Sequence, residues 1–195
     1  MNRNAFRGVA ATFCLPLAFA ACDDGPSEPG PTAASFSVYL TDAPGDVEAV
    51  WLEILSASLQ GEDETVPLLD ESTGLIEVTE LVGRAQEIVD DAPIPDGRYG
   101  KLSLIIGGAV LETTGGDVYT REGASHPGGL EATGQLHCPS CSQSGLKVQL
   151  HGVQIDGGDN ALVLDFDVHQ SFGKQAGNSG RWVMTPVIRA EDFSA

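Results

Sequence analysis

Most of the chain alternates apolar and polar residues in short runs, a pattern typical of half-buried β-strands. In the first such run, Phe36, Val38 and Leu40 are separated by single intervening residues. Similar runs recur at short spacing along the rest of the chain. The pattern predicts strands over 35–40, 47–59, 65–69, 75–81, 98–106, 109–113, 117–120, 146–155, 161–168 and 181–190.

Glycine and proline, with 24 and 11 residues, interrupt these runs at the places where turns are expected. Only 80–89 has apolar residues near helical spacing, and we predict a short helix there. Residues 121–145 lack apolar periodicity and are predicted to form a long loop. The sequence therefore predicts an all-β domain, an antiparallel β-sandwich with one short helix.

The N-terminus has the pattern of a lipoprotein export signal. Arg3 and Arg7 precede an apolar run, 9–21, which ends in small residues before Cys22. This run is shorter than the ~20 residues that a membrane-spanning helix needs. We predict a signal peptide over 1–21 and lipidation of Cys22. The alternative is a plain secreted protein in which Cys22 is a free thiol.

The remaining chain divides into three parts by composition. Residues 22–34 are rich in proline and lack apolar runs, so we expect a disordered tether. The folded domain is predicted over 35–190, and 191–195 are predicted to be a C-terminal tail. Asp23 follows the lipidated cysteine and resembles an inner-membrane retention signal. Anchoring in the inner membrane and anchoring in the outer membrane are both kept as alternatives.

The charge balance limits the classes of partner that the protein is expected to bind. The formal net charge is −18, and removal of 1–21 takes away two arginines and no acid, leaving about −20. Such a surface repels phosphate backbones, which excludes nucleic-acid binding. It also disfavours electrostatic attachment to anionic lipids. Contact with the membrane is therefore expected through the lipid anchor.

Three segments together resemble a known family. They are 37–44 (SVYLTDAP), 94–99 (IPDGRY) and 162–167 (LVLDFD), the last followed by 185–189 (TPVIR). In this order they resemble the bacterial domain of unknown function 4382 (DUF4382), found in exported and lipid-anchored proteins. The resemblance implies a prealbumin-like or immunoglobulin-like sandwich. It assigns no activity, although prealbumin-like modules often recognise protein or glycan ligands through end loops.

A glycine-rich insert carries the most distinctive local motif, His137-Cys138-Pro139-Ser140-Cys141. In an oxidising compartment, Cys138 and Cys141 are expected to form a disulfide. Two alternatives stay open at this point. The two thiolates with His126 and His137 would supply four ligands for zinc, or the C-x-x-C pair would be redox-active.

Acidic residues form a second candidate site. Asp42 and Asp46 flank one predicted turn, while Asp165 and Asp167 share one face of a predicted strand. Carboxylates gathered at one end of a sandwich would suit calcium. The simpler interpretation is that Asp42 caps its turn and that Asp165 and Asp167 line a solvated face. A third hypothesis is an envelope hydrolase that uses paired carboxylates.

The sequence carries no Gly-x-Ser-x-Gly elbow, phosphate-binding loop or dinucleotide fingerprint. Trp51 and Trp182 lie in apolar strand patterns and are expected to be core anchors. We therefore predict a non-catalytic, lipid-anchored binding or scaffolding module of the bacterial cell envelope. Its expected ligand is an envelope protein or a glycan, and it is expected to need no cofactor unless the calcium or zinc alternative holds.

Overall fold

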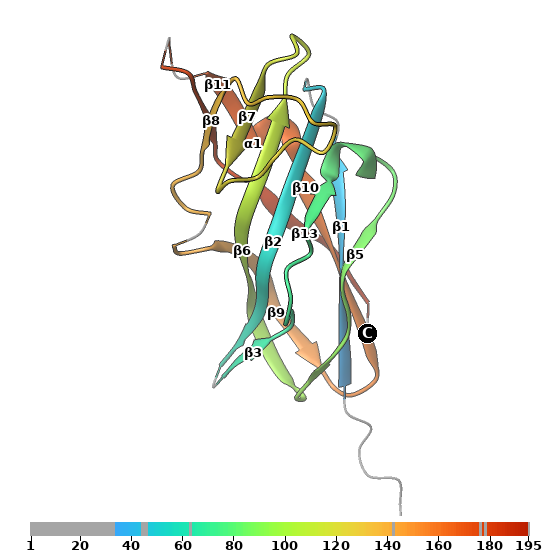
Figure 1. The fold of residues 1–195 in the computed structure, drawn as a ribbon. Helices are drawn as coiled ribbons and strands as arrows, with labels where there is room; N and C mark the ends of the chain where they lie inside the picture. Colours follow the sequence, from blue (N-terminus) through green and yellow to red (C-terminus); the bar gives the residue numbers. More distant parts are fainter. Residues whose placement is uncertain are drawn as a thin grey trace, which may run out of the picture. The chain divides into compact units, whose positions relative to one another are not determined.

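The computed structural model describes residues 34–43, 47–62, 64–141, 143–175, 177 and 179–194. The predicted signal peptide, Cys22, the tether up to residue 33 and Asp46 lie outside the described residues. The described residues form two β-sheets and two very short helices, η1 and α1 (Figure 1).

The smaller sheet has four strands, and its two central strands are parallel. They come from opposite ends of the domain sequence, so this sheet brings the two ends of the domain together. Its outer strands are antiparallel to their neighbours. The order across the sheet is β13 (Ile188–Ser194), β10 (Asp159–Asp167), β1 (Ala34–Ala43) and β5 (Gln86–Ile94).

The larger sheet has nine strands and is built around one long antiparallel pair, β2 and β6. The main path through this sheet is β11 (Phe172–Gln175), β12 (Arg181–Met184), β8 (Gly134–His137), β7 (Val118–Arg121), β6 (Gly97–Glu112), β2 (Ala49–Gly61) and β3 (Thr65–Pro67). Two further strands pair outside this path: β4 (Leu75–Glu77) with β2, and β9 (Leu146–Ile155) with β6. The pairs β7–β8 and β8–β12 are parallel.

The main hydrophobic core contains apolar side chains of both sheets. Phe36 of β1 and Leu164 of β10 are buried with Leu52 of β2 and Leu104 of β6, each no more than 2% exposed. Alternation along the strands places these side chains on the buried faces. The predicted β-sandwich is confirmed, but its sheets are mixed rather than antiparallel throughout.

The Pro-x-Gly-x-Tyr segment, 95–99, has a clear structural role. Tyr99 is 2% exposed, and its hydroxyl donates a hydrogen bond to the backbone oxygen of Pro95 at 2.9 Å. This bond satisfies the buried hydroxyl while the ring fills the core. Burial raises the Tyr99 pKa above its ordinary value, with smaller contributions from Glu64 and Asp96. The segment thus fixes the turn that leads into β6.

The predicted helix over 80–89 is wrong. A 3-10 helix, η1 (Val78–Leu81), comes first, and β5 begins at Gln86. Ile88 and Val89 are both buried, and their β-branched side chains favour an extended backbone. Strand β5 lies at the edge of its sheet. An edge strand tolerates Pro93, because the backbone N–H that proline lacks is not needed for pairing on the open side.

The predicted loop over 121–145 contains a strand, β8. It begins at Gly134, where a Cβ atom would lie 2.3 Å from the backbone oxygen of Gly180. Only glycine allows the backbones to approach this closely. Because β8 is four residues long and pairs only with parallel strands, its own sequence carries too little pattern to reveal it.

The C-terminal region also differs from the prediction. The single strand expected over 181–190 is two strands in different sheets, β12 and β13. Residues 191–194, expected to be a tail, extend β13 along β10. The ring of Phe193 stacks on Phe36 with centroids 6.4 Å apart, so this last strand contributes to the core. A four-residue helix, α1 (Val168–Ser171), follows β10.

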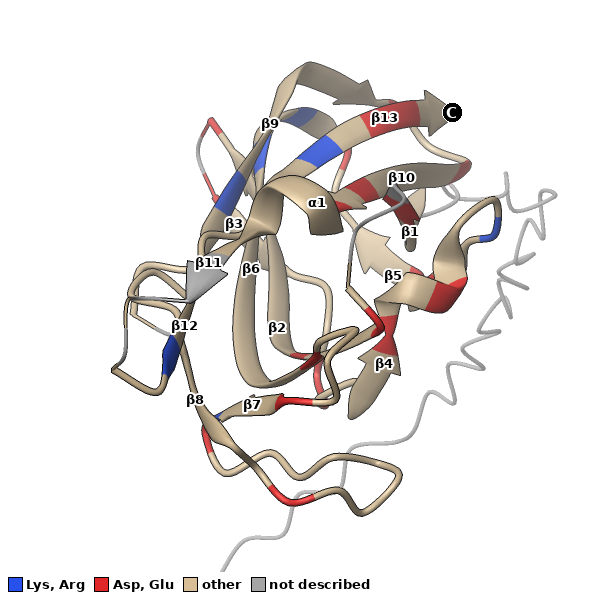
Figure 2. Cartoon of the chain, turned by 90° about the horizontal axis from the view of Figure 1, so that it is seen from above, with Lys and Arg blue, Asp and Glu red and all other residues tan. Residues whose placement is uncertain are grey.

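Acidic residues are spread over both sheets (Figure 2). They lie on β10 and β13 of the smaller sheet and beside β7 of the larger one. The full chain has 28 acidic against 10 basic residues, and the acidic residues of the domain lie on several of its sides.

Candidate binding pocket beside the disulfide

The site begins with a break in the pairing along β6. Strand β9 pairs with β6 as far as Leu104, and β7 pairs with it from Ala109 onward. Between these two segments, the N–H of Ile106 donates to the backbone oxygen of Cys141 at 3.1 Å. The cysteine loop therefore takes the place of a neighbouring strand at this position.

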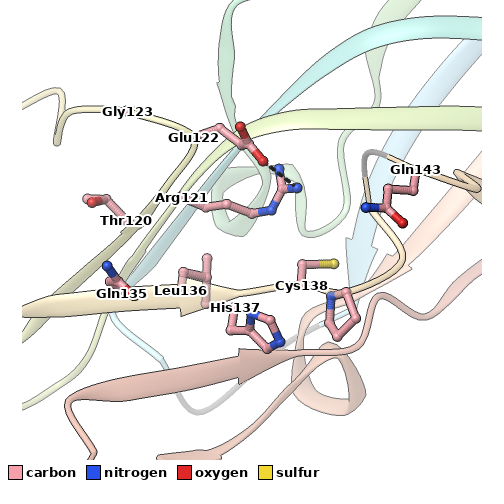
Figure 3. Close-up of a pocket in the computed structure, with 10 residues that line it drawn as sticks. Thr120, Arg121, Glu122, Gly123, Gln135, Leu136, His137, Cys138 and Gln143 are labelled. Carbon is pink, nitrogen blue, oxygen red and sulfur yellow. Dashed lines mark ion pairs between the residues drawn. The ribbon is translucent and has the colours of Figure 1, made fainter.

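A buried arginine, Arg121, binds backbone groups at the same break in pairing. Nη1 of Arg121 donates to the backbone oxygen of Ile106 at 3.2 Å and, at shorter range, to that of Gly107. Arg121 is 8% exposed, because it lies on the same face of β7 as the buried Tyr119. Its Nη2 forms an ion pair with Glu122 at 2.8 Å (Figure 3). The guanidinium therefore satisfies two buried carbonyls that no strand reaches.

Cys138 and Cys141 form a disulfide across four residues, with Cα atoms 5.6 Å apart. Both are buried, at 6% and 0% exposure. The predicted disulfide is confirmed in the structure. It holds the loop that bonds to Ile106, and in this oxidised form the two sulfurs are not the thiolates that a zinc ion would need as ligands.

A pocket of about 490 Å³ opens beside this loop (Figure 3). The side chains of Gln135, His137 and Gln143 are exposed at the pocket, whereas Arg121 and Cys138 are buried. We call this cavity the Arg121 pocket. Because Glu122 balances the guanidinium, the pocket offers mainly amide and imidazole groups for hydrogen bonding rather than an unbalanced charge.

The four residues considered for zinc are not gathered around one point. His126 lies under the 122–133 loop, where its ring meets the edge of Trp51 with centroids 4.7 Å apart. Its Nε2 lies 2.9 Å from a carboxylate oxygen of Glu112, and its Nδ1 accepts from the N–H of Gly128 at 2.9 Å. His126 thus attaches this loop to the outer face of the larger sheet.

His137 remains beside the disulfide, at the Arg121 pocket. Within the part of the chain that the structure describes, no group of three or more His, Cys, Asp or Glu side chains is placed to hold a metal ion.

The candidate calcium residues lie on the smaller sheet, apart from Asp46, which is not described. Asp42 accepts a hydrogen bond from the N–H of Val168 at 3.2 Å. Asp167 caps α1 by accepting from the N–H of Gln170 at 2.8 Å, and it also pairs with Arg189 at 3.2 Å. These carboxylates bind protein groups that stabilise the end of the sheet.

The expected solvated face at Asp165 and Asp167 is wrong, since each residue is 7% exposed. Burial, with the nearby charges of Glu191 and Asp167, raises the Asp165 pKa, although Arg189 partly opposes the shift. Burial acts in the same direction on Asp167, but its bonds from Gln170 and Arg189 outweigh burial and lower the Asp167 pKa. The pair therefore titrates over separate ranges.

Sequence reasoning missed the three polar residues Arg121, Gln135 and Gln143. One signal was present for Arg121: continuing the alternation of the predicted strand 117–120 places it on the buried face with Tyr119. A charged residue at a strand position that is predicted to be buried indicates either an ion pair or a functional site. Gln135 and Gln143 carried no such signal, because they lie in the stretch predicted to be a loop.

Comparison with known families supports the resemblance seen in the sequence. The family described as "Domain of unknown function (DUF4382)" matches residues 33–186. The chain belongs to this family. The DUF4382 match starts just before β1 and ends after β12, so it includes every residue of the Arg121 pocket, while β13 follows it.

The DUF4382 family has no assigned function. Comparison with curated proteins and with solved structures gave no match. Within the described residues, neither helix has the length and apolar character needed to cross a bilayer.

Proposed function

We propose that this protein is an exported, lipid-anchored module of the bacterial cell envelope that binds a glycan in the Arg121 pocket, without catalysis. The observation that carries the proposal is the chemistry of the pocket. The pocket presents groups that both donate and accept hydrogen bonds, from Gln135, His137 and Gln143. Arg121 and the disulfide hold the backbone that surrounds the pocket.

A neutral, hydroxyl-rich ligand fits these groups best. Each sugar hydroxyl donates one hydrogen bond and accepts others, as a glutamine amide does. An anionic ligand is disfavoured, because Glu122 already balances Arg121 and the chain carries a net charge of −18. The pocket volume, about 490 Å³, lies within the range of small-molecule sites.

The proposed location rests on the N-terminal sequence. Two arginines, an apolar run and small residues precede Cys22, which would carry the lipid. The disulfide is consistent with an oxidising compartment outside the cytoplasm. The proline-rich residues 22–34 would then separate the domain from the membrane surface.

Binding is tested with soluble oligosaccharides from neutral, amino-sugar and acidic classes, titrated calorimetrically into the purified protein. We expect a neutral or amino-sugar member to bind and acidic members not to bind. Gln143→Ala should weaken binding about tenfold, the effect of one lost hydrogen bond of about 1.4 kcal/mol. The matched control, Gln149→Ala, changes an exposed residue on β9 outside the pocket and should leave affinity within about twofold.

Failure of all three classes to bind, or equal losses in the two glutamine variants, contradicts the glycan proposal. The anchor is tested separately by metabolic labelling with a palmitate analogue in a bacterial host. Label should enter the native chain and be lost in Cys22→Ser. An unlabelled native chain contradicts the anchor and leaves the pocket proposal standing.

A further inference from the structure

Arg98, near the start of β6, packs across the neighbouring strand β9. At that point Gly152 has a φ of 77°, and a Cβ atom there would lie 2.6 Å from Nε of Arg98. Glycine at position 152 therefore leaves the space that the guanidinium occupies. Arg98 and the nearby Lys101 are both exposed, and neither forms an ion pair with another described residue. Two cations of an acidic chain are thus left available to an anionic group.

Two adjoining hollows meet at Arg98, and their charged residues differ in sign. The first hollow, of about 210 Å³, has Lys101 in its lining, whereas the second, of about 260 Å³, has Glu64 and Asp96. Both are lined by Gly61, Glu62 and Arg98. The remaining lining residues are uncharged: Gln60, Gly97, Tyr99, Gly100 and Gly152. We call the two hollows together the Arg98 site, which has cations at one end and carboxylates at the other.

The Arg98 site lies at the end of the sandwich where the chain enters the domain. A carboxylate oxygen of Asp96 accepts a hydrogen bond from the N–H of Gly157 at 2.8 Å. The backbone oxygen of Gly158, in the same turn, accepts from the N–H of Ser35 at 2.9 Å. The β2–β3 hairpin and the start of β6 lie at this end together with the start of β1 (Figure 1). The site is therefore close to the first residues of β1.

We infer that the Arg98 site binds a phosphodiester that is joined by a short linker to a primary ammonium, the chemistry of phosphoethanolamine. The planar fork of an arginine matches two phosphate oxygens, and a lysine adds a point charge. Glu64 and Asp96 supply acceptors for the N–H groups of the ammonium. A lone anion is repelled by the acidic chain, whereas this zwitterion carries no net charge.

Each hollow is smaller than the usual small-molecule site of about 300–1,000 Å³, so each suits one charged group of the ligand. A soluble molecule and a lipid headgroup both offer this chemistry. If Cys22 carries the proposed anchor, the chain from Cys22 to β1 spans at most about 40 Å, which keeps the site near the membrane. Only this second source depends on the proposed anchor, and the glycan proposal uses other residues.

The test compares two soluble phosphodiesters, glycerophosphoethanolamine and glycerophosphoglycerol, of which only the first carries an ammonium. Each is titrated into the ¹⁵N-labelled protein, and the Arg98 Nε–H and Gly152 amide signals are followed by NMR. We expect saturable shifts of both signals, with glycerophosphoethanolamine bound about fivefold more tightly, as for a partly exposed ion pair. Glu64→Gln should reduce this preference to about twofold, because the ammonium loses one carboxylate.

Arg98→Gln should weaken binding of glycerophosphoethanolamine about tenfold, since it removes the charged fork. The matched control, Arg84→Gln, changes an exposed arginine outside the site and should leave the affinity within about twofold. The inference is overturned if neither signal shifts saturably or if the native protein binds both phosphodiesters equally. Equal losses of affinity in the two arginine variants overturn it as well.

Vesicles distinguish the two sources of the ligand. The Cys22→Ser chain, which cannot be acylated at that position, is sedimented with phosphatidylcholine vesicles that contain or lack phosphatidylethanolamine. The quaternary ammonium of phosphatidylcholine has no N–H to donate to the carboxylates. Binding that requires phosphatidylethanolamine and is lost in Arg98→Gln assigns the lipid headgroup. Binding of soluble glycerophosphoethanolamine without vesicle binding assigns a soluble ligand.

Discussion

Arg121 provides the sharpest test of how the pocket is built. Arg121→Met keeps an unbranched side chain in the same space but removes the guanidinium. The buried carbonyls of Ile106 and Gly107 then lose their bonds from Nη1. Each unsatisfied buried acceptor costs about 1–3 kcal/mol. The ion pair with Glu122 adds less than about 1 kcal/mol, because Glu122 is 53% exposed.

We therefore expect Arg121→Met to lower the free energy of unfolding by about 2–4 kcal/mol, since methionine recovers part of the loss by burying its apolar atoms. Urea denaturation followed by circular dichroism measures the change, as a shift of the midpoint of about 1–2 M at unchanged slope. Arg181→Met, at an exposed arginine on β12, is the matched control and should stay within about 0.5 kcal/mol of the native protein. A similarly small effect of Arg121→Met would refute the role assigned to the guanidinium.

Four further predictions address other parts of the fold. Reduction of the Cys138–Cys141 bond should lower Tm by roughly 4–8 °C, since a four-residue loop contributes about 2 kcal/mol; a double serine variant should not respond to reductant. Asp167→Ala should cost about 1 kcal/mol in urea unfolding at pH 7. Because folding lowers the Asp167 pKa, this loss should shrink as the pH falls through the folded-state value. Asp165→Asn should instead gain stability at pH 7, because folding raises the Asp165 pKa, and the gain should vanish below the ordinary carboxyl pKa. Phe193→Ala should lower stability by about 1–2 kcal/mol in thermal unfolding, and no change would place β13 outside the cooperative fold.

Strands with one buried face could be predicted from the sequence because burial imposes a period of two. The runs at Phe36–Leu40 and Leu162–Phe166 show this period, and both lie in the centre of the smaller sheet. Their parallel pairing could not be predicted, because alternation reports which face is buried and not which strand lies alongside. The same limit applies to β8, which is held by its neighbours rather than by its own pattern.

The helix predicted over 80–89 shows how tertiary pairing overrides local spacing. Leu81, Ala85, Ile88 and Val89 fit a helical face, but Ala85 is exposed in the fold, and Val89 pairs with Val38 of β1. The β-branched residues of this segment gain more from the sheet edge than a short isolated helix would provide.

The candidate site was only partly visible in the sequence. The disulfide between Cys138 and Cys141 could be predicted, because the two cysteines are close in the chain and an oxidising compartment is expected. Arg121 binds backbone carbonyls that are exposed by a break in strand pairing, and such a break leaves no pattern in the sequence. Likewise, Asp165 and Asp167 pair with Arg189, which a separate strand brings to them.

The central claim, that the Arg121 pocket binds a glycan, is tested most directly by NMR of glutamine side-chain amides. A neutral or amino-sugar oligosaccharide from the proposed panel is titrated into the ¹⁵N-labelled protein. We expect saturable shifts of the Gln135 and Gln143 amide signals, while the Gln149 amide on β9 stays unchanged. Saturable binding that leaves both pocket amides unmoved, or that moves Gln149 equally, would rule out glycan binding in the Arg121 pocket.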